Sequence, residues 1–124
     1  MLKVSIELIY DVDIADFKTD ECCKNYEFET TNDCYKFFER YTEEEIIPII
    51  KESLKRILID DNFITQIDIA ADIDSGSAII TIKFNIDDVL RTIYYLLVYN
   101  LKDELLKDKR KPYLSIFVDD KKII

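Results

Sequence analysis

Residues 66–86 read Gln66-Ile-Asp-Ile-Ala-Ala-Asp-Ile-Asp-Ser-Gly76-Ser-Ala-Ile-Ile-Thr-Ile-Lys-Phe-Asn-Ile86, and Gly76 is the only glycine in the chain of 124 residues. Apolar and polar side chains alternate on both sides of this glycine, which is the pattern of two strands joined by a tight turn. A two-residue loop at Ser75-Gly76 pairs Ile67 with Phe84, Ile69 with Ile82, Ala71 with Ile80 and, on the reverse face, Asp68 with Lys83. We therefore predict a β-hairpin in this register, with one apolar face.

The composition indicates one domain, residues 1–124, with its own hydrophobic core. The chain is 48% hydrophobic and shows regular periodicity, which excludes disorder as its main state. The N-terminus alternates like a strand instead of carrying the apolar block of a signal peptide, and no apolar run is long enough to span a membrane. We expect a cytoplasmic protein that does not bind membranes.

Histidine is absent, and the cysteines are Cys22, Cys23 and Cys34. An odd, sparse set of cysteines is not a disulfide framework, so reduced thiols are expected. Without histidine, the Ser-His-Asp and Cys-His types of nucleophile activation are excluded. We predict no catalytic residues, no bound metal and no cofactor.

The charge is strongly acidic and unevenly distributed. The chain has 26 acidic and 17 basic residues, a net charge of −9, and residues 1–88 alone carry 21 acids against 9 bases. Binding to nucleic acid depends on lysine and arginine at the phosphates, so direct nucleic-acid binding is not expected. An acidic body instead favours association with a basic partner.

The remaining elements follow from periodicity and capping signals. Residues 2–14 alternate as a long strand, and residues 26–30 as a short extra one. A first helix is predicted to begin at a cap on Asn32 or Asp33. Thr42-Glu-Glu-Glu45 has the form of a capping box, which implies a fresh helix start there, and Pro48 should add a kink. We therefore expect either two helices that meet near Thr42 or one bent helix that ends near Ile59.

The C-terminal third contains a second helix and a last strand. The helix is predicted over residues 87–109, with Lys107, Lys109, Arg110 and Lys111 near its negative end and Pro112 as its stop. Residues 113–119 alternate as a strand, and Lys121-Lys122 would guard that edge of the sheet against pairing. The order strand, helix, strand, strand, helix, strand predicts an α+β fold, a two-layer ferredoxin-like βαββαβ sandwich. Its departures from the ideal are a long insertion at 15–32 and the broken first helix.

On this fold one sheet face lacks helices, and apolar side chains with an acidic surround would lie on it. Such a mixture is typical of an interaction surface. The alternative is that residues 15–32 fold across this face and cover it. The predicted partner-binding residues are Glu7, Ile9, Asp11, Asp68, Asp72, Ile79, Tyr113 and Phe117.

Two further features leave alternatives open. Asp11, Asp13 and Asp16, with Asp72 and Asp74, could hold a divalent cation, although their spacing lacks the glycine and glutamate of an EF-hand loop. Tyr94, Tyr95 and Tyr99, near Leu96 and Val98, make the second helix apolar almost all round. Such a helix is buried in the core or meets a second copy in a homodimer.

The sequence therefore predicts a small non-enzymatic interaction module. It would bind, and could inhibit, a basic protein such as a nuclease or another nucleic-acid-binding protein, in the manner of immunity proteins and phage-encoded inhibitors. The alternatives are a structural homo-oligomer and a divalent-metal-dependent enzyme that uses the aspartate cluster.

Overall fold

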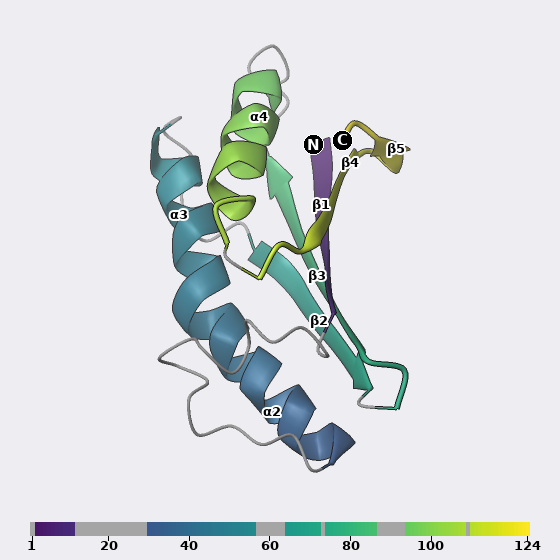
Figure 1. The fold of residues 1–124 in the computed structure, drawn as a ribbon. Helices are drawn as coiled ribbons and strands as arrows, with labels where there is room; N and C mark the ends of the chain where they lie inside the picture. The colour runs from purple at the N-terminus through teal and green to yellow at the C-terminus, as the bar shows by residue number, and fades with distance from the viewer. Residues whose placement is uncertain (1, 12–29, 57–63, 73, 87–93, 109) are drawn as a thin grey trace.

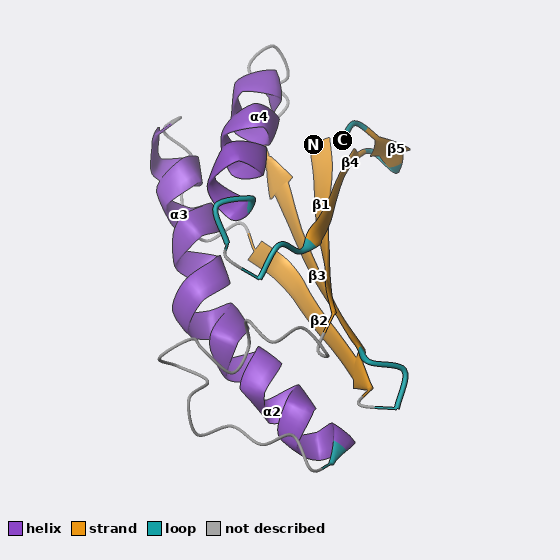
Figure 2. Ribbon diagram, viewed as in Figure 1, coloured by secondary structure: helices purple, strands orange, loops and turns teal. Residues whose placement is uncertain are grey.

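The computed structural model describes residues 2–11, 30–56, 64–72, 74–86, 94–108 and 110–124. Helices α2, α3 and α4 lie on the same side of the sheet, and none of the described elements covers its other face, which we call the open face (Figure 1, Figure 2). The elements are β1 (Leu2–Asp11), α2 (Thr31–Tyr41), η1 (Thr42–Ile46), α3 (Ile47–Arg56), β2 (Ile64–Asp72), β3 (Ser77–Ile86), α4 (Tyr94–Leu105), β4 (Tyr113–Val118) and β5 (Lys121–Lys122).

Within the described ranges the strands form one five-stranded sheet in the order β2-β3-β1-β4-β5, and every neighbouring pair is antiparallel. The α+β class is confirmed. The sheet differs in strand order and count from the ferredoxin-like βαββαβ arrangement expected from the sequence, because residues after β4 add the strand β5.

The β2–β3 hairpin is present, but its predicted register is wrong by two residues. Ile67 pairs with Ile82 and Asp68 with Thr81, and the last pair before the turn is Asp72 with Ser77. The cause is the turn chemistry at Asp72, whose Oδ1 accepts a hydrogen bond from the Asp74 N–H at 3.0 Å. A shift of two keeps each side chain on its predicted face but removes the expected Asp68–Lys83 pair, since Gln66 lies opposite Lys83 instead.

Gly76 is required by this turn, because its φ of 68° lies in the left-handed region. We expect Gly76→Val to lower the free energy of unfolding by about 1–3 kcal/mol, since a β-branched residue is strained there. Gly76→Asn is the matched control, because asparagine tolerates this conformation. Urea unfolding of both variants measures the difference, and equal stability of the two would contradict the role given to backbone conformation.

The first helical region begins earlier than predicted and is not restarted at Thr42. Its N-cap is Thr30, whose Oγ1 accepts from the Asp33 N–H at 3.2 Å, rather than Asn32 or Asp33. Thr42 has helical dihedrals and donates its hydroxyl to the Phe38 carbonyl at 2.7 Å, so the predicted capping box does not form. Instead, α2 continues through the π-helical turn η1 into α3. A wider turn just before Pro48 is consistent with a residue that lacks an N–H and clashes with the preceding turn.

The predicted end of the second helix is also wrong, because α4 ends at Leu105 and not near residue 109. The strand that follows is β4, and Asp119 and Asp120, with φ of 49° and 65°, form the tight turn that leads into β5. Asp119 fixes this turn to β1, since its Oδ1 accepts from the Lys3 N–H at 2.9 Å. Lys121-Lys122 thus form the edge strand itself.

The hydrophobic core lies between the helices and the face of the sheet that they cover. Ile80 and Ile82 of β3 are fully buried, whereas Ile67 of the edge strand β2 is 42% exposed. The largest fully buried side chains are Tyr10, Phe38, Phe84, Ile6, Leu8, Ile46, Ile50, Leu54, Ile80, Ile82, Ile86 and Leu97.

No helix in the described part of the chain is long and apolar enough to cross a membrane. The predictions for residues 12–29, 57–59 and 87–93 lie outside the described residues.

Candidate functional site

The open face of the sheet is built from cross-strand rows, because antiparallel register places residues of neighbouring strands side by side. The even-numbered residues of β1 and β3 are buried under the helices, so their odd-numbered residues face the open side. Asp68, Ala70 and Asp72 of β2 and Tyr113, Ser115 and Phe117 of β4 join these rows.

One row is apolar. It consists of Ala70, Ile79, Ile9 and Tyr113, taken in order from β2, β3, β1 and β4. Ile79 is 37% exposed and Tyr113 is 76% exposed. Three large apolar groups in one row therefore face away from the core.

The two rows that flank it are acidic. One holds Asp72, Ser77 and Asp11; the other holds Asp68, Thr81, Glu7 and Ser115. Across these three rows there are four carboxylates and no lysine or arginine. We call Glu7, Ile9, Asp11, Asp68, Asp72, Ile79 and Tyr113 the acidic–apolar patch.

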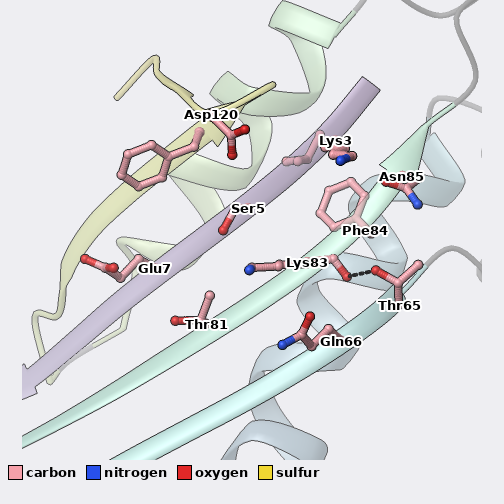
Figure 3. A pocket seen from close by; sticks show the side chains of 12 residues that line it. Lys3, Ser5, Glu7, Thr65, Gln66, Thr81, Lys83, Phe84, Asn85 and Asp120 are labelled. Atoms are coloured by element: carbon pink, nitrogen blue, oxygen red, sulfur yellow. Dashed lines mark hydrogen bonds between the residues drawn. The ribbon is translucent and has the colours of Figure 1, made fainter. Parts of the chain in front are cut away.

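The structure thus brings together all the residues predicted to bind a partner except Phe117, which lies one row farther from the apolar row. Phe117 pairs with Ser5, and Ser5 with Lys83. This part of the face is a concavity of about 650 Å³ that Phe117 lines together with Lys3, Lys83, Glu7 and Asp120. Figure 3 shows Glu7, Ser5, Thr81 and Lys83 over the adjoining strands β1 and β3, and a hydrogen bond from Thr65 to the Lys83 carbonyl. Here the charges are mixed, unlike those of the patch.

The acids proposed as metal ligands are only partly placed. Asp11 and Asp72 both pair with Ser77, whereas Asp13 and Asp16 lie outside the described residues. Among the residues that the structure places, no three cysteine or acidic side chains are grouped so that they could hold a metal ion. Of the cysteines, Cys34 is described, and it is a buried free thiol whose pKa is raised by burial and by nearby Asp72.

Helix α4 exposes apolar side chains on its outer side. Of the two alternatives for this helix, burial in the core is right for Val98, which is buried, but wrong for Tyr95, Leu96 and Tyr99, which are 52%, 65% and 55% exposed. The ring of Tyr94 stacks on that of Tyr95, with centroids 4.1 Å apart. The helix therefore has one face in the core and one apolar face in solvent.

A buried polar network, which the sequence did not predict, lies on the covered side of the sheet, beside the connection that follows α4. Asp108 accepts hydrogen bonds from the hydroxyls of Tyr10, at 3.0 Å, and Tyr41. The Arg110 guanidinium lies 3.3 Å from the Asp108 Oδ1 and 4.2 Å from the Tyr41 ring centroid. The network joins β1 and the end of α2 to the connection between α4 and β4, so its arrangement indicates a structural role.

This network should make the protein sensitive to alkali. Burial, with the neighbouring Asp108, raises the pKa of both Tyr10 and Tyr41 far above the ordinary value of 10.0. The folded state therefore keeps both protons while the unfolded chain loses them above pH 10. The stabilisation is complete below pH 10 and falls by about 1.4 kcal/mol per pH unit per tyrosine above it.

Urea unfolding at about pH 9 and pH 11 measures this loss. In Tyr41→Phe the loss of unfolding free energy per pH unit should be roughly halved, because only one buried tyrosine then has a raised pKa in the folded state. Tyr95→Phe, at an exposed tyrosine, is the matched control and should keep the full slope. A flat stability profile in the unmodified protein would contradict the prediction.

In comparisons with known proteins, no protein-family model, no curated protein and no solved structure matched this chain. Its function must therefore be argued from its own geometry.

Proposed function

We propose that the protein is a non-enzymatic interaction module that binds a basic protein through the acidic–apolar patch. The observation that carries this proposal is the row of Ile79, Ile9 and Tyr113 between two rows whose only charged groups are carboxylates. Apolar groups at the centre of an interface supply affinity, and charges around them select the partner and speed its approach. A basic partner is the one whose charge complements these rows.

The kind of partner follows from the same features. Nucleases and other nucleic-acid-binding proteins carry the basic surfaces that bind phosphates, and an acidic protein that covers such a surface blocks it. Inhibition in the manner of an immunity protein or a phage-encoded inhibitor is the activity we favour. The buried free thiol of Cys34 supports the reducing cytoplasm as its compartment.

A site-specific crosslinker tests the patch. We would replace Tyr113 with p-benzoylphenylalanine, irradiate in the lysate of cells that express the chain, and identify the captured proteins by mass spectrometry. Tyr99, an exposed tyrosine on α4, is the matched control position. We expect basic proteins to be captured from position 113 only, and capture to be lost at about 0.5 M salt.

Equal capture from the two positions would contradict the proposal, as would capture of acidic proteins that persists at high salt. Recovery of a covalent dimer of the chain from position 113 would show that a second copy covers the patch.

The fold also supports a finer assignment as a proposal, namely a ferredoxin-like sandwich extended by one strand. What supports it is the order β2-β3-β1-β4 within the sheet, the two helical regions on one face, and the chain order of the elements. The strand β5 is then an addition at the edge next to β4.

A structural homo-oligomer is the second candidate, favoured by the exposed Tyr95, Leu96 and Tyr99 on α4. Light scattering on the purified chain tests it directly. A dimer that Leu96→Lys converts to a monomer would support this candidate, whereas a monomer at high concentration would exclude it.

A further inference from the structure

The two edges of the sheet differ in how they are protected from pairing. The β5 edge is two residues long, both of them lysine, and follows a tight turn. Short strands and lysines are among the usual devices that keep an edge from pairing with another chain. The opposite edge, β2, is nine residues long and contains no lysine, arginine, proline or glycine.

The geometry of β2 leaves most of its length regular. It pairs with β3 without interruption from Gln66 to Asp72, and the one irregularity lies between Ile64 and Gln66, at its start. On its outer side no strand pairs with it in the described part of the chain. Its side chains from Thr65 to Asp68 are exposed, including Ile67 at 42%. The regular stretch is long enough to template a further strand of about seven residues.

The charges on β2 select among possible occupants. The register places Asp68 and Asp72 on the same face of β2, four residues apart, with Ala70 between them. The Asp72 Oδ1 also accepts hydrogen bonds from the Asp74 N–H at 3.0 Å and from the Thr31 hydroxyl of α2 at 3.4 Å. If β2 of a second copy paired antiparallel with this strand and turned its open face to the same side, an aspartate of one copy would lie opposite or diagonal to an aspartate of the other. Like charges in those positions are destabilising, whereas lysine or arginine there would be favourable.

We propose that β2 is a strand-addition site for an extended basic segment of the partner. The segment extends the sheet by pairing its backbone with the outer edge of β2. It places two basic side chains four residues apart beside Asp68 and Asp72, and apolar side chains toward Ile67, Ile69 and Ala71. Backbone hydrogen bonds supply affinity in this mode of recognition, and alternate side chains supply specificity. The inference rests on the proposed function, since it assumes a basic partner, and it specifies how that partner binds.

The experiment uses the full chain, labelled with ¹⁵N, and a synthetic probe peptide, acetyl-Lys-Val-Thr-Val-Lys-Val-Thr-amide. We expect hydrogen exchange at amides of β2 to slow when the peptide is added at low salt. The same peptide with alternate backbone nitrogens methylated should give no protection, because it cannot form the ladder. Asp68→Lys should weaken binding about tenfold, whereas Asp103→Lys, an exposed acid on α4, should leave it unchanged.

Equal binding of the methylated peptide would overturn strand addition. Slow exchange of the outer β2 amides before any peptide is added would also overturn it, since the edge would then be covered. Spectral changes confined to Ile79 and Tyr113, without protection in β2, would reject strand addition while leaving binding at the acidic–apolar patch intact. Failure of crosslinking from position 113 would instead count against the proposed function itself.

Discussion

Replacing Asp108 with alanine is expected to lower the free energy of unfolding by about 3–5 kcal/mol. The side chains of Arg110 and Asp108 are only 5% and 10% exposed, and their closest atoms are 3.3 Å apart. Without the carboxylate, a buried guanidinium loses its counter-charge, and the hydroxyls of Tyr10 and Tyr41 lose an acceptor. Removing one member of a buried pair costs more than the pair contributes, because the remaining charge stays away from water.

Urea unfolding with a fixed m-value measures this loss. Asp103→Ala, at an exposed acid of the neighbouring helix α4, is the matched control and should change stability by less than about 0.5 kcal/mol. The double variant Asp108→Leu with Arg110→Met should recover part of the loss, since it removes both charges together. A loss in Asp108→Ala no larger than that in Asp103→Ala would show that water reaches Arg110 and replaces its partner.

The sequence was sufficient to predict which side chains share each face of the sheet, because the period of two in a strand places alternate residues on opposite faces. Ile9, Ile79 and Tyr113 each interrupt the polar face of their strand, and that interruption was the signal. The hairpin register could not be predicted in the same way, since it depends on the hydrogen bond that Asp72 accepts inside the turn. Both registers keep the apolar face intact, so hydrophobic pattern could not distinguish them.

The buried network could not be predicted, because its members are far apart in the chain. In the sequence, Tyr10 and Tyr41 have the pattern of ordinary core residues, and Arg110 is one of several basic residues that follow a predicted helix. Because α4 ends early, at Leu105, the chain that follows it brings Asp108 to the two tyrosine hydroxyls and Arg110 over the Tyr41 ring. The backbone N–H of Arg110 also donates to the Asp108 Oδ1 at 2.9 Å, which stabilises this turn. The signal available was an aspartate and an arginine two residues apart beyond a helix, which is too common to single out.

The largest expected effect on binding is that of Tyr113→Ala, which should weaken the affinity for the basic partner by about thirtyfold, or roughly 2 kcal/mol. Tyr113 is 76% exposed at the end of the apolar row, so its ring is available to a partner and contributes little to the core. Aromatic residues within an apolar centre are the usual energetic anchors of interfaces, since they bury a large area with few rotatable bonds.

Tyr99→Ala is the matched control for this prediction, because Tyr99 is also exposed, at 55%, but lies on α4, which packs on the covered face of the sheet. Affinity is measured by titration calorimetry against the protein captured from position 113, after both variants are shown to unfold at the same urea concentration. Equal affinities of the two variants would remove Tyr113 as an anchor. A loss in Tyr99→Ala alone would transfer the contact to α4. The comparison separates the two surfaces because each variant deletes one exposed aromatic ring and leaves the net charge of the chain unchanged.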